Sequence, residues 1–277
     1  MESTHLKKAG QDFWDANPCG GNWNNYADFL AWIQRIEPYG FEITKQHDWG
    51  GKRVLDVGCG QGTLINYLPS FGAIMFGADM SLASLRRAAA GANELGYSDV
   101  VHVAAADAEI LPFRSECFDA VLCFGVLHHT PDTQSGIEEL WRVLKPGGLA
   151  IVMLYRSGNP KWWMVRLVRC LSTLTDHITG KDHTISYWLR KRQRFDNVSG
   201  TALLELFGVP VLKGFSNKQV REIFHMFSSV KITNHQPGFR RLADVVKILK
   251  PFEKSLRWFD QRVMQMWGFY QVIQAIK

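Results

Sequence analysis

The sequence predicts an α/β protein with a mostly parallel sheet. Between residues 52 and 155, short β-branched runs alternate with helical patterns, which is the order expected of βαβ units. The runs are apolar on both faces, as in a sheet that helices cover on each side. A length of 277 residues, with 46% hydrophobic and 21% charged residues, suits one large domain or a domain with a cap. This composition excludes disordered, collagen-like and coiled-coil proteins.

The elements can be predicted in order along the chain. Residues 1–51 are rich in Trp, Asn and Gly, and they predict helices and loops that form an N-terminal lid. Residues 52–155 and 228–277 are expected to form the core. Its strands are expected at residues 53–57, 73–79, 100–105, 118–123, 149–154, 229–234 and 269–276. Its helices are expected at residues 62–69, 81–95, 133–144 and 240–266.

The helix expected over residues 81–95 has a recognisable start and a recognisable buried face. Ser81 is a suitable N-cap because its hydroxyl can accept a hydrogen bond from the first helical turn. Leu82, Leu85, Ala89 and Ala92 recur at helical spacing and predict the stripe that faces the sheet.

Residues 156–227 break the alternation and predict a helical cap inserted between the fifth and sixth strands. Between residues 156 and 200 the chain has nine basic and three acidic residues, which accounts for the whole net charge of +6. Aromatic residues alternate with the arginines in the same stretch.

Three glycines at alternate positions, Gly58, Gly60 and Gly62, follow the first core strand and precede a helix. Glycine is needed where backbone turns tightly and approaches a ligand closely. The spacing GxGxG differs from the GxGxxG of dinucleotide sites, and Asp56 lies inside the strand two positions before the first glycine. A carboxylate there disfavours a pyrophosphate and favours a cation. S-adenosylmethionine carries two cationic groups, a sulfonium and an ammonium.

Two more carboxylates are expected at the same edge of the sheet. Asp79 closes the second strand, where it can accept both hydroxyls of a ribose. Asp107 follows the third strand, where a side chain reaches an adenine edge. These positions fit the same ligand.

With these motifs the chain resembles the class I S-adenosylmethionine-dependent methyltransferases, in particular the ubiquinone/menaquinone C-methyltransferases and their small-molecule relatives. The resemblance covers about residues 52–154, with residues 269–277 resembling the last strand of that fold. It rests on residues 54–62, 77–81, 107–113, 118–119, 126–129 and 142–148. It implies a Rossmann-like, seven-stranded, mostly parallel sheet with an antiparallel last strand.

The resemblance implies S-adenosyl-L-methionine as the cofactor, with S-adenosyl-L-homocysteine as the product. It places Asp56 beneath the ammonium group and the glycine backbone beside the methionine part. The cofactor-binding positions that it implies are Asp56, Gly58, Gly60, Gly62, Asp79, Met80, Asp107, Ala108 and Phe124.

The remaining roles carry over residue by residue. Asp79 would hold the ribose hydroxyls, and Met80 would lie beside the adenine face. Asp107 would bind the adenine amino group, and the backbone of Ala108 a ring nitrogen. The backbone of Phe124 would meet the ammonium group.

Methyl transfer from a sulfonium is a direct displacement, so a catalytic base is optional. The candidates are His128 and His129, which follow the fourth strand at the edge where the reacting atoms are expected. The alternative is that at least one of them bonds backbone, because the Leu-His-His run is common in this family for any acceptor.

The cap lies where this family inserts its acceptor-binding residues. Aromatic rings beside guanidinium groups suit a small molecule with an apolar body and an anionic end, such as an isoprenoid diphosphate or an acyl or aromatic acid. If arginines recognise that anion, charge reversal at Arg190 and Arg194 should raise the acceptor KM and spare cofactor affinity. The predicted acceptor-binding residues are Trp163, Tyr187, Trp188, Arg190 and Arg194.

Other interpretations of the cap and of the function stay open. The cap could be a helix–helix interface, and either the cap or the lid could form a contact in a homo-oligomer. Residues 162–174 could attach to a membrane surface. The acceptor could be an uncharged phenol or amine, and the chain could be a non-catalytic S-adenosylmethionine-binding scaffold. Nucleic acid is disfavoured, because Phe124 opens a Phe-Gly-Val-Leu run where adenine and glutamine methyltransferases have Asn- or Asp-Pro-Pro-aromatic.

The cysteines and the N-terminus bear on the compartment. Five scattered cysteines without a CxxC pair favour neither disulfides nor a metal site, and a reducing cytoplasm is expected. Residues 1–10 lack the apolar core of a signal peptide, and no run approaches the ~20 apolar residues that cross a bilayer. A role in specialised metabolism is expected.

Overall fold

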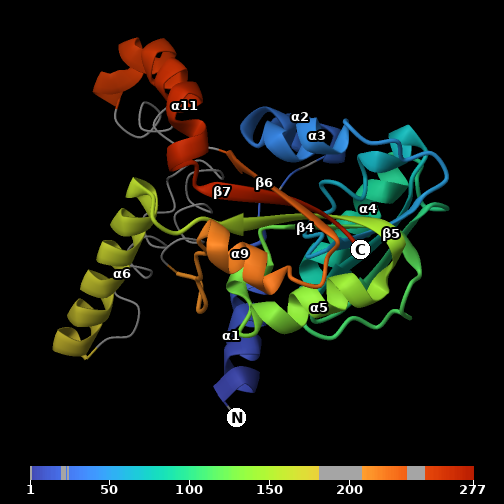
Figure 1. Cartoon of the computed structure of the whole chain (residues 1–277), viewed down its shortest axis with the longest axis horizontal. Helices are drawn as coiled ribbons and strands as arrows, with labels where there is room; N and C mark the ends of the chain where they lie inside the picture. The colour runs from blue at the N-terminus through green and yellow to red at the C-terminus, as the bar shows by residue number, and fades with distance from the viewer. Residues whose placement is uncertain (1, 20–22, 24, 181–207, 236–246) are drawn as a thin grey trace.

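The computed structural model describes residues 2–19, 23, 25–180, 208–235 and 247–277. The strands of this part of the chain form one seven-stranded sheet in the order β3-β2-β1-β4-β5-β7-β6 (Figure 1). Their bounds are β1 Arg53–Val57, β2 Ile74–Asp79, β3 Val101–Ala105, β4 Phe118–Phe124, β5 Leu144–Tyr155, β6 Ser229–His235 and β7 Tyr270–Ile276.

The strand directions are those that the sequence predicts. β1 pairs in parallel with β2 and β4, β2 with β3, and β4 with β5. Of the strands in the described ranges, only β7 runs in the opposite direction, since it lies antiparallel between β5 and β6. The mostly parallel α/β sheet with an antiparallel last strand is therefore confirmed.

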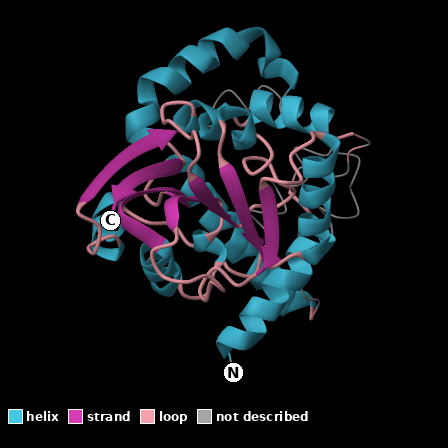
Figure 2. Ribbon diagram, turned by 90° about the vertical axis from the view of Figure 1, so that its right-hand side faces the viewer, coloured by secondary structure: helices cyan, strands magenta, loops and turns pink. Residues whose placement is uncertain are grey.

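Helices lie on both sides of the sheet (Figures 1 and 2). Their bounds are α1 Glu2–Ala16, α2 Tyr26–Ile36, α3 Pro38–Thr44, α4 Leu82–Glu94, α5 Thr133–Val143, α6 Pro160–Thr179, α9 Asn217–Ile223 and α11 Glu253–Trp267. Shorter 3-10 helices span Leu68–Phe71, Leu127–His129 and Lys247–Phe252.

The sheet separates two apolar cores, one on each face. Val54 belongs to the core that also contains residues of α2, α3 and α4, whereas the next residue, Leu55, belongs to the core with α5 and α9. Both side chains are fully buried. Because successive residues of a strand point to opposite faces, this division explains why the central strands are apolar throughout.

Several predicted elements differ in extent. The sequence predicts a helix over residues 62–69, but they form turns that end in the 3-10 helix Leu68–Phe71. Gly62 has a φ of +94°, which is not helical, and Pro69 lacks the backbone N–H that an α-helix interior needs. β5 begins at Leu144 rather than at residue 149, because Leu144 pairs with Phe118. Of the helix expected over 240–266, residues 240–246 lie outside the described part, and α11 follows a 3-10 helix that contains Pro251.

The predicted cap of α4 is confirmed, but its predicted buried face is partly wrong. The Ser81 hydroxyl accepts a hydrogen bond from the Ser84 backbone N–H. Leu82 is 51% exposed and Ala89 is exposed too. The buried side chains are instead those of Ser84, Leu85, Ala88 and Ala92 with Gly91, on which the Tyr26 ring rests. The face is rotated because α2 packs against α4 at the glycine.

α6 extends away from the sheet (Figure 1). Trp162 and Val165 anchor its first turns in the core. Its outward face carries large apolar side chains that are about half exposed or more, namely Trp163, Met164, Leu167, Leu171, Leu174 and Ile178. None of the helices in the described ranges is long and apolar enough to cross a membrane. Membrane-surface attachment through this segment stays a prediction.

Candidate functional site

A cavity of about 240 Å³ lies at the carboxyl ends of the central strands, the edge at which parallel α/β sheets bind ligands. Most of the predicted site residues border it. They are Asp56, Gly58, Gly60, Asp79, Met80, Asp107, Ala108, Phe124 and His129. Gly62, His128 and Trp163 do not border it. Tyr187, Trp188, Arg190 and Arg194 lie outside the described residues.

The glycine loop after β1 has two members that approach the cavity and one that does not. Gly58 and Gly60 have φ angles of +71° and +53°, a conformation that favours glycine. A Cβ on Gly60 would meet nothing within 4 Å, so this backbone faces open space. A Cβ on Gly62 would lie 2.7 Å from Asn66 Nδ2 and 3.0 Å from Ala88. Gly62 therefore lets the loop approach α4 and does not border the cavity, and its predicted place beside the ligand stays a prediction.

Replacing each of the two cavity glycines with alanine is expected to separate folding from binding. Both changes strain a positive φ by about 1–2 kcal/mol. In Gly58→Ala the new Cβ would lie 2.1 Å from Val126 Cγ2, so this variant should lose about 3 kcal/mol or more of unfolding free energy. Gly60→Ala should fold but bind S-adenosylhomocysteine about tenfold more weakly or worse, because its methyl group fills ligand space. Urea denaturation and calorimetric titration measure the two effects, and equal destabilisation would contradict this assignment.

Asp56 places a buried carboxyl group at the cavity. The residue is 4% exposed, and burial, with a smaller contribution from Asp79, raises the pKa of its carboxyl to about 8. Within the described residues, no hydrogen bond or ion pair joins this side chain to another. A buried carboxylate without a partner is costly, so a cationic ligand group would be strongly favoured here. The ammonium of S-adenosylmethionine fits this position.

Asp79 ends β2 and holds the glycine loop in place. One carboxylate oxygen accepts a hydrogen bond from the Gly60 backbone N–H at 2.9 Å, and the other accepts one from Ser81 N–H at 2.8 Å. Burial raises the pKa of the Asp79 carboxyl despite these bonds. A carboxylate has about four acceptor positions, so its lone pairs can still accept ligand hydroxyls. This arrangement fits the predicted ribose contact.

The adenine end of the predicted site is covered by α1. Lys7 pairs with Asp107 at 2.6 Å. Gln11 donates a hydrogen bond to the Met80 carbonyl, and Asp15 accepts one from the Ser81 hydroxyl. The N-terminal helix thus lies over the ends of β2 and β3, as a lid would.

The structure distinguishes the two candidate histidines. His129 borders the cavity, and its Nδ1 lies 2.9 Å from the Val211 carbonyl oxygen. A carbonyl only accepts, so Nδ1 carries the hydrogen and Nε2 is the basic nitrogen of the neutral ring. His128 is fully buried, and its ring stacks on that of Tyr155 with the centroids 3.8 Å apart. Burial lowers the pKa of the His128 ring well below the usual range. His128 therefore lies in the core and does not border the cavity, whereas the sequence predicts it near the reacting atoms.

Several cavity residues were missed by the sequence analysis. Tyr39 from α3 and Tyr270 from β7 border the cavity with their rings 5.3 Å apart, and Phe124 lies 6.2 Å from Tyr39. These three aromatic residues come from segments distant in the sequence and without a shared motif, so no local signal joins them. Trp14 of α1, by contrast, lies in the predicted N-terminal lid, and it borders the cavity beside His129, with ring centroids 5.5 Å apart.

Comparisons with known proteins give the following similarities. A family model described as a methyltransferase domain matches residues 55–152. The chain is 31% identical over 189 residues to a ubiquinone biosynthesis O-methyltransferase of Pectobacterium atrosepticum, covering 66% of this chain and 75% of that protein. A Coxiella burnetii protein of the same name is 35% identical over 128 residues. This match covers 46% of this chain and about half (54%) of the length of that relative.

Solved structures share the fold. Phosphoethanolamine N-methyltransferase 2 of Haemonchus contortus, solved in complex with S-adenosyl-L-methionine, superimposes with a TM-score of 0.53 at 18% identity. The match covers 99% of this chain and 57% of that one. At this identity the similarity concerns the fold alone.

Proposed function

Because this chain belongs to the class I S-adenosylmethionine-dependent methyltransferases, we propose that it methylates a hydroxyl oxygen of a small molecule with an apolar, aromatic body and an anionic end. The observation that carries the proposal is His129, a base candidate held at the cavity by the Val211 carbonyl. The relatives named O-methyltransferases support oxygen as the acceptor atom.

The residues around the cavity suit the cofactor and the reaction. S-adenosylmethionine, when bound, supplies a methyl group activated by its sulfonium. Asp56 would hold its ammonium group, Asp79 its ribose hydroxyls and Asp107 its adenine. His129 Nε2 would accept the proton of the acceptor hydroxyl, which makes the oxygen a better nucleophile. The covering α1 would keep water from the reacting groups.

The acceptor body is inferred from the aromatic wall. Tyr39, Phe124 and Tyr270, together with Met153, offer an apolar surface for a flat ring. The described part of the wall contains acidic side chains and the paired Lys7, so it supplies no obvious site for an anion. The proposed anionic end rests on Arg190 and Arg194, which lie outside the described residues.

Incubation with methyl-labelled S-adenosylmethionine and two pools of acceptors is expected to show label on oxygen. One pool holds hydroxylated isoprenoid, acyl and aromatic acids, and the other holds uncharged phenols and amines. Transfer should be at least about tenfold faster in the anionic pool, since a charged hydrogen bond contributes about 1.5–3 kcal/mol. Mass spectrometry of the products identifies the methylated atom.

Matched acceptors give the control for this experiment. A methoxy analogue of each active acceptor has the same body and charge but no hydroxyl to methylate, so it should take no label. Label on carbon or nitrogen would refute the oxygen assignment. Cofactor binding without transfer to any acceptor would favour the scaffold alternative.

A further inference from the structure

We infer that Lys7 and Glu109 form a positioning link between the lid helix α1 and the loop that carries His129. The inference rests on the proposed function, because it assigns the link to the placement of His129 in that site. Lys7 lies outside the motifs of the resemblance, and Glu109 lies within the segment 107–113 but has no predicted contact with the cofactor. Neither would touch the reacting atoms.

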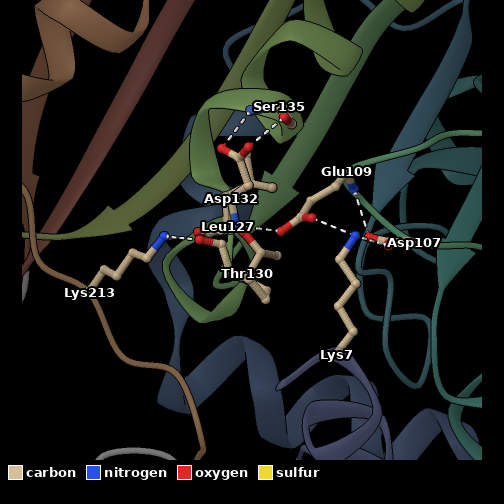
Figure 3. A network of polar contacts seen from close by, with 9 residues as sticks. Lys7, Asp107, Glu109, Leu127, Thr130, Asp132, Ser135 and Lys213 are labelled. Atoms are coloured by element: carbon tan, nitrogen blue, oxygen red, sulfur yellow. Dashed lines mark hydrogen bonds and ion pairs between the residues drawn. The ribbon is translucent and has the colours of Figure 1, made fainter. Parts of the chain in front are cut away.

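The first half of the link is the ammonium group of Lys7. It lies 2.6 Å from a carboxylate oxygen of Asp107 and 2.5 Å from one of Glu109 (Figure 3). The Glu109 side chain is only 5% exposed, whereas that of Lys7 is 25% exposed. The backbone N–H of Glu109 also donates to Asp107 at 2.9 Å. One cation therefore joins α1 to two carboxylates after β3.

The second half of the link is the other oxygen of Glu109. It accepts a hydrogen bond from the Asp132 backbone N–H at 2.6 Å. Asp132 closes the loop that follows β4, and its own carboxylate caps α5 by accepting from Ser135 N–H (Figure 3). The 3-10 helix Leu127–His129 lies in the same loop. Glu109 thus fixes one end of the loop that bears His129.

The opposite side of this loop is held by contacts that involve neither Lys7 nor Glu109. The Lys213 ammonium donates to the Pro131 carbonyl at 2.6 Å, and its backbone N–H donates to the His128 carbonyl at 2.9 Å. The Thr133 hydroxyl donates to the Leu127 carbonyl at 2.7 Å. If Glu109 were lost, the Asp132 backbone N–H would lose its hydrogen-bond acceptor and this end of the loop would become more mobile. The remaining contacts would keep the loop folded. His129 would then lose part of its fixed position.

The energetics make Lys7 necessary to this arrangement. A carboxylate as buried as that of Glu109 is costly without a cation, and removing one partner of a buried pair leaves the other charge uncompensated. The same ammonium contacts Asp107, the residue predicted to bind adenine. Docking of α1, occupation of the adenine end and placement of His129 are therefore coupled, and such coupling is reciprocal.

Lys7→Met tests the link, and Lys8→Met is its matched control. Lys8 lies on the same helix, but it pairs with Asp12 at 2.6 Å on an exposed surface. In the intact 277-residue chain, Lys7→Met should raise amide hydrogen exchange over residues 127–132 about tenfold. It should also lower kcat more than it raises the acceptor KM, whereas Lys8→Met should change neither. Lys7→Arg, which keeps the charge, should restore much of the protection.

A double variant separates a link from two unrelated defects. Glu109→Gln keeps an oxygen for the Asp132 N–H but removes the charge that Lys7 needs. If both residues act through one link, Lys7→Met combined with Glu109→Gln should speed exchange no more than Lys7→Met alone. Additive effects, or faster exchange confined to α1 with residues 127–132 unchanged, would overturn the inference. Exchange is measured without any acceptor, so it decides this inference even if no methyl transfer is found.

Discussion

Asp56→Asn is expected to weaken S-adenosylhomocysteine binding by about 100-fold and, at the same time, to stabilise the ligand-free protein. The amide cannot pair with the ligand ammonium as the carboxylate does. In the ligand-free protein, however, it removes a buried group whose ionisation opposes folding, because Asp56 is 4% exposed and without a partner among the described residues. Titration calorimetry and urea denaturation measure the two effects.

The pH dependence fixes the sign of the stability change. The Asp56 pKa is about 8 in the folded protein, against an ordinary value of 3.8. The unfolded chain therefore binds fewer protons between these values, so this group lowers the unfolding free energy as pH rises from about 4 to 8. Asp56→Asn should therefore raise the unfolding free energy by less than about 1 kcal/mol at pH 4 and by on the order of 5 kcal/mol at pH 8.

Ionisation of Asp56 with rising pH, which lowers the unfolding free energy, should raise the affinity for the ligand. Only the ionised Asp56 pairs with an ammonium group, so wild-type affinity should rise between pH 6 and pH 8 by up to about tenfold per unit. This slope should be much reduced in Asp56→Asn, although the Asp79 carboxyl, whose pKa burial also raises, can contribute a remainder. An Asn variant that binds as the wild type does would refute the assignment of Asp56 to the ammonium.

His129→Asn is expected to lower kcat by between about 10² and 10⁴-fold while leaving S-adenosylhomocysteine affinity within about twofold. The asparagine amide can still donate to the Val211 carbonyl, so the loop keeps the contact that His129 Nδ1 now makes. What it lacks is the basic nitrogen at the cavity. Steady-state kinetics with the acceptor identified by label transfer measures the loss.

His128 supplies the control for this prediction. His128→Phe keeps an aromatic ring against Tyr155, whose ring lies 3.8 Å from that of His128. Its effect should be on the unfolding midpoint, with a much smaller effect on kcat than that of His129→Asn. Comparable losses of kcat in both variants would mean that the loop as a whole, and not the His129 base, is required.

The fold and the cofactor end of the site could be predicted from the sequence because their signals are local. Strands that are buried on both faces must be apolar throughout, and Val54 and Leu55 in opposite cores show why. Asp56, Gly58 and Gly60 lie within five residues of one another, so one strand and one turn place them together. The position of Asp79 beside them can also be predicted, because the carboxyl ends of neighbouring parallel strands meet at one edge of the sheet.

The tertiary structure alone decided which neighbouring residue faces which surroundings. His128 and His129 are adjacent in a 3-10 helix, and packing against Tyr155 determines that the first is buried and the second borders the cavity. Likewise, a GxGxG motif specifies backbone freedom at Gly62 but not that α4 would lie against it. The contact of Lys7 with Glu109 joins residues about a hundred positions apart, and periodicity reports burial but not the identity of a distant partner.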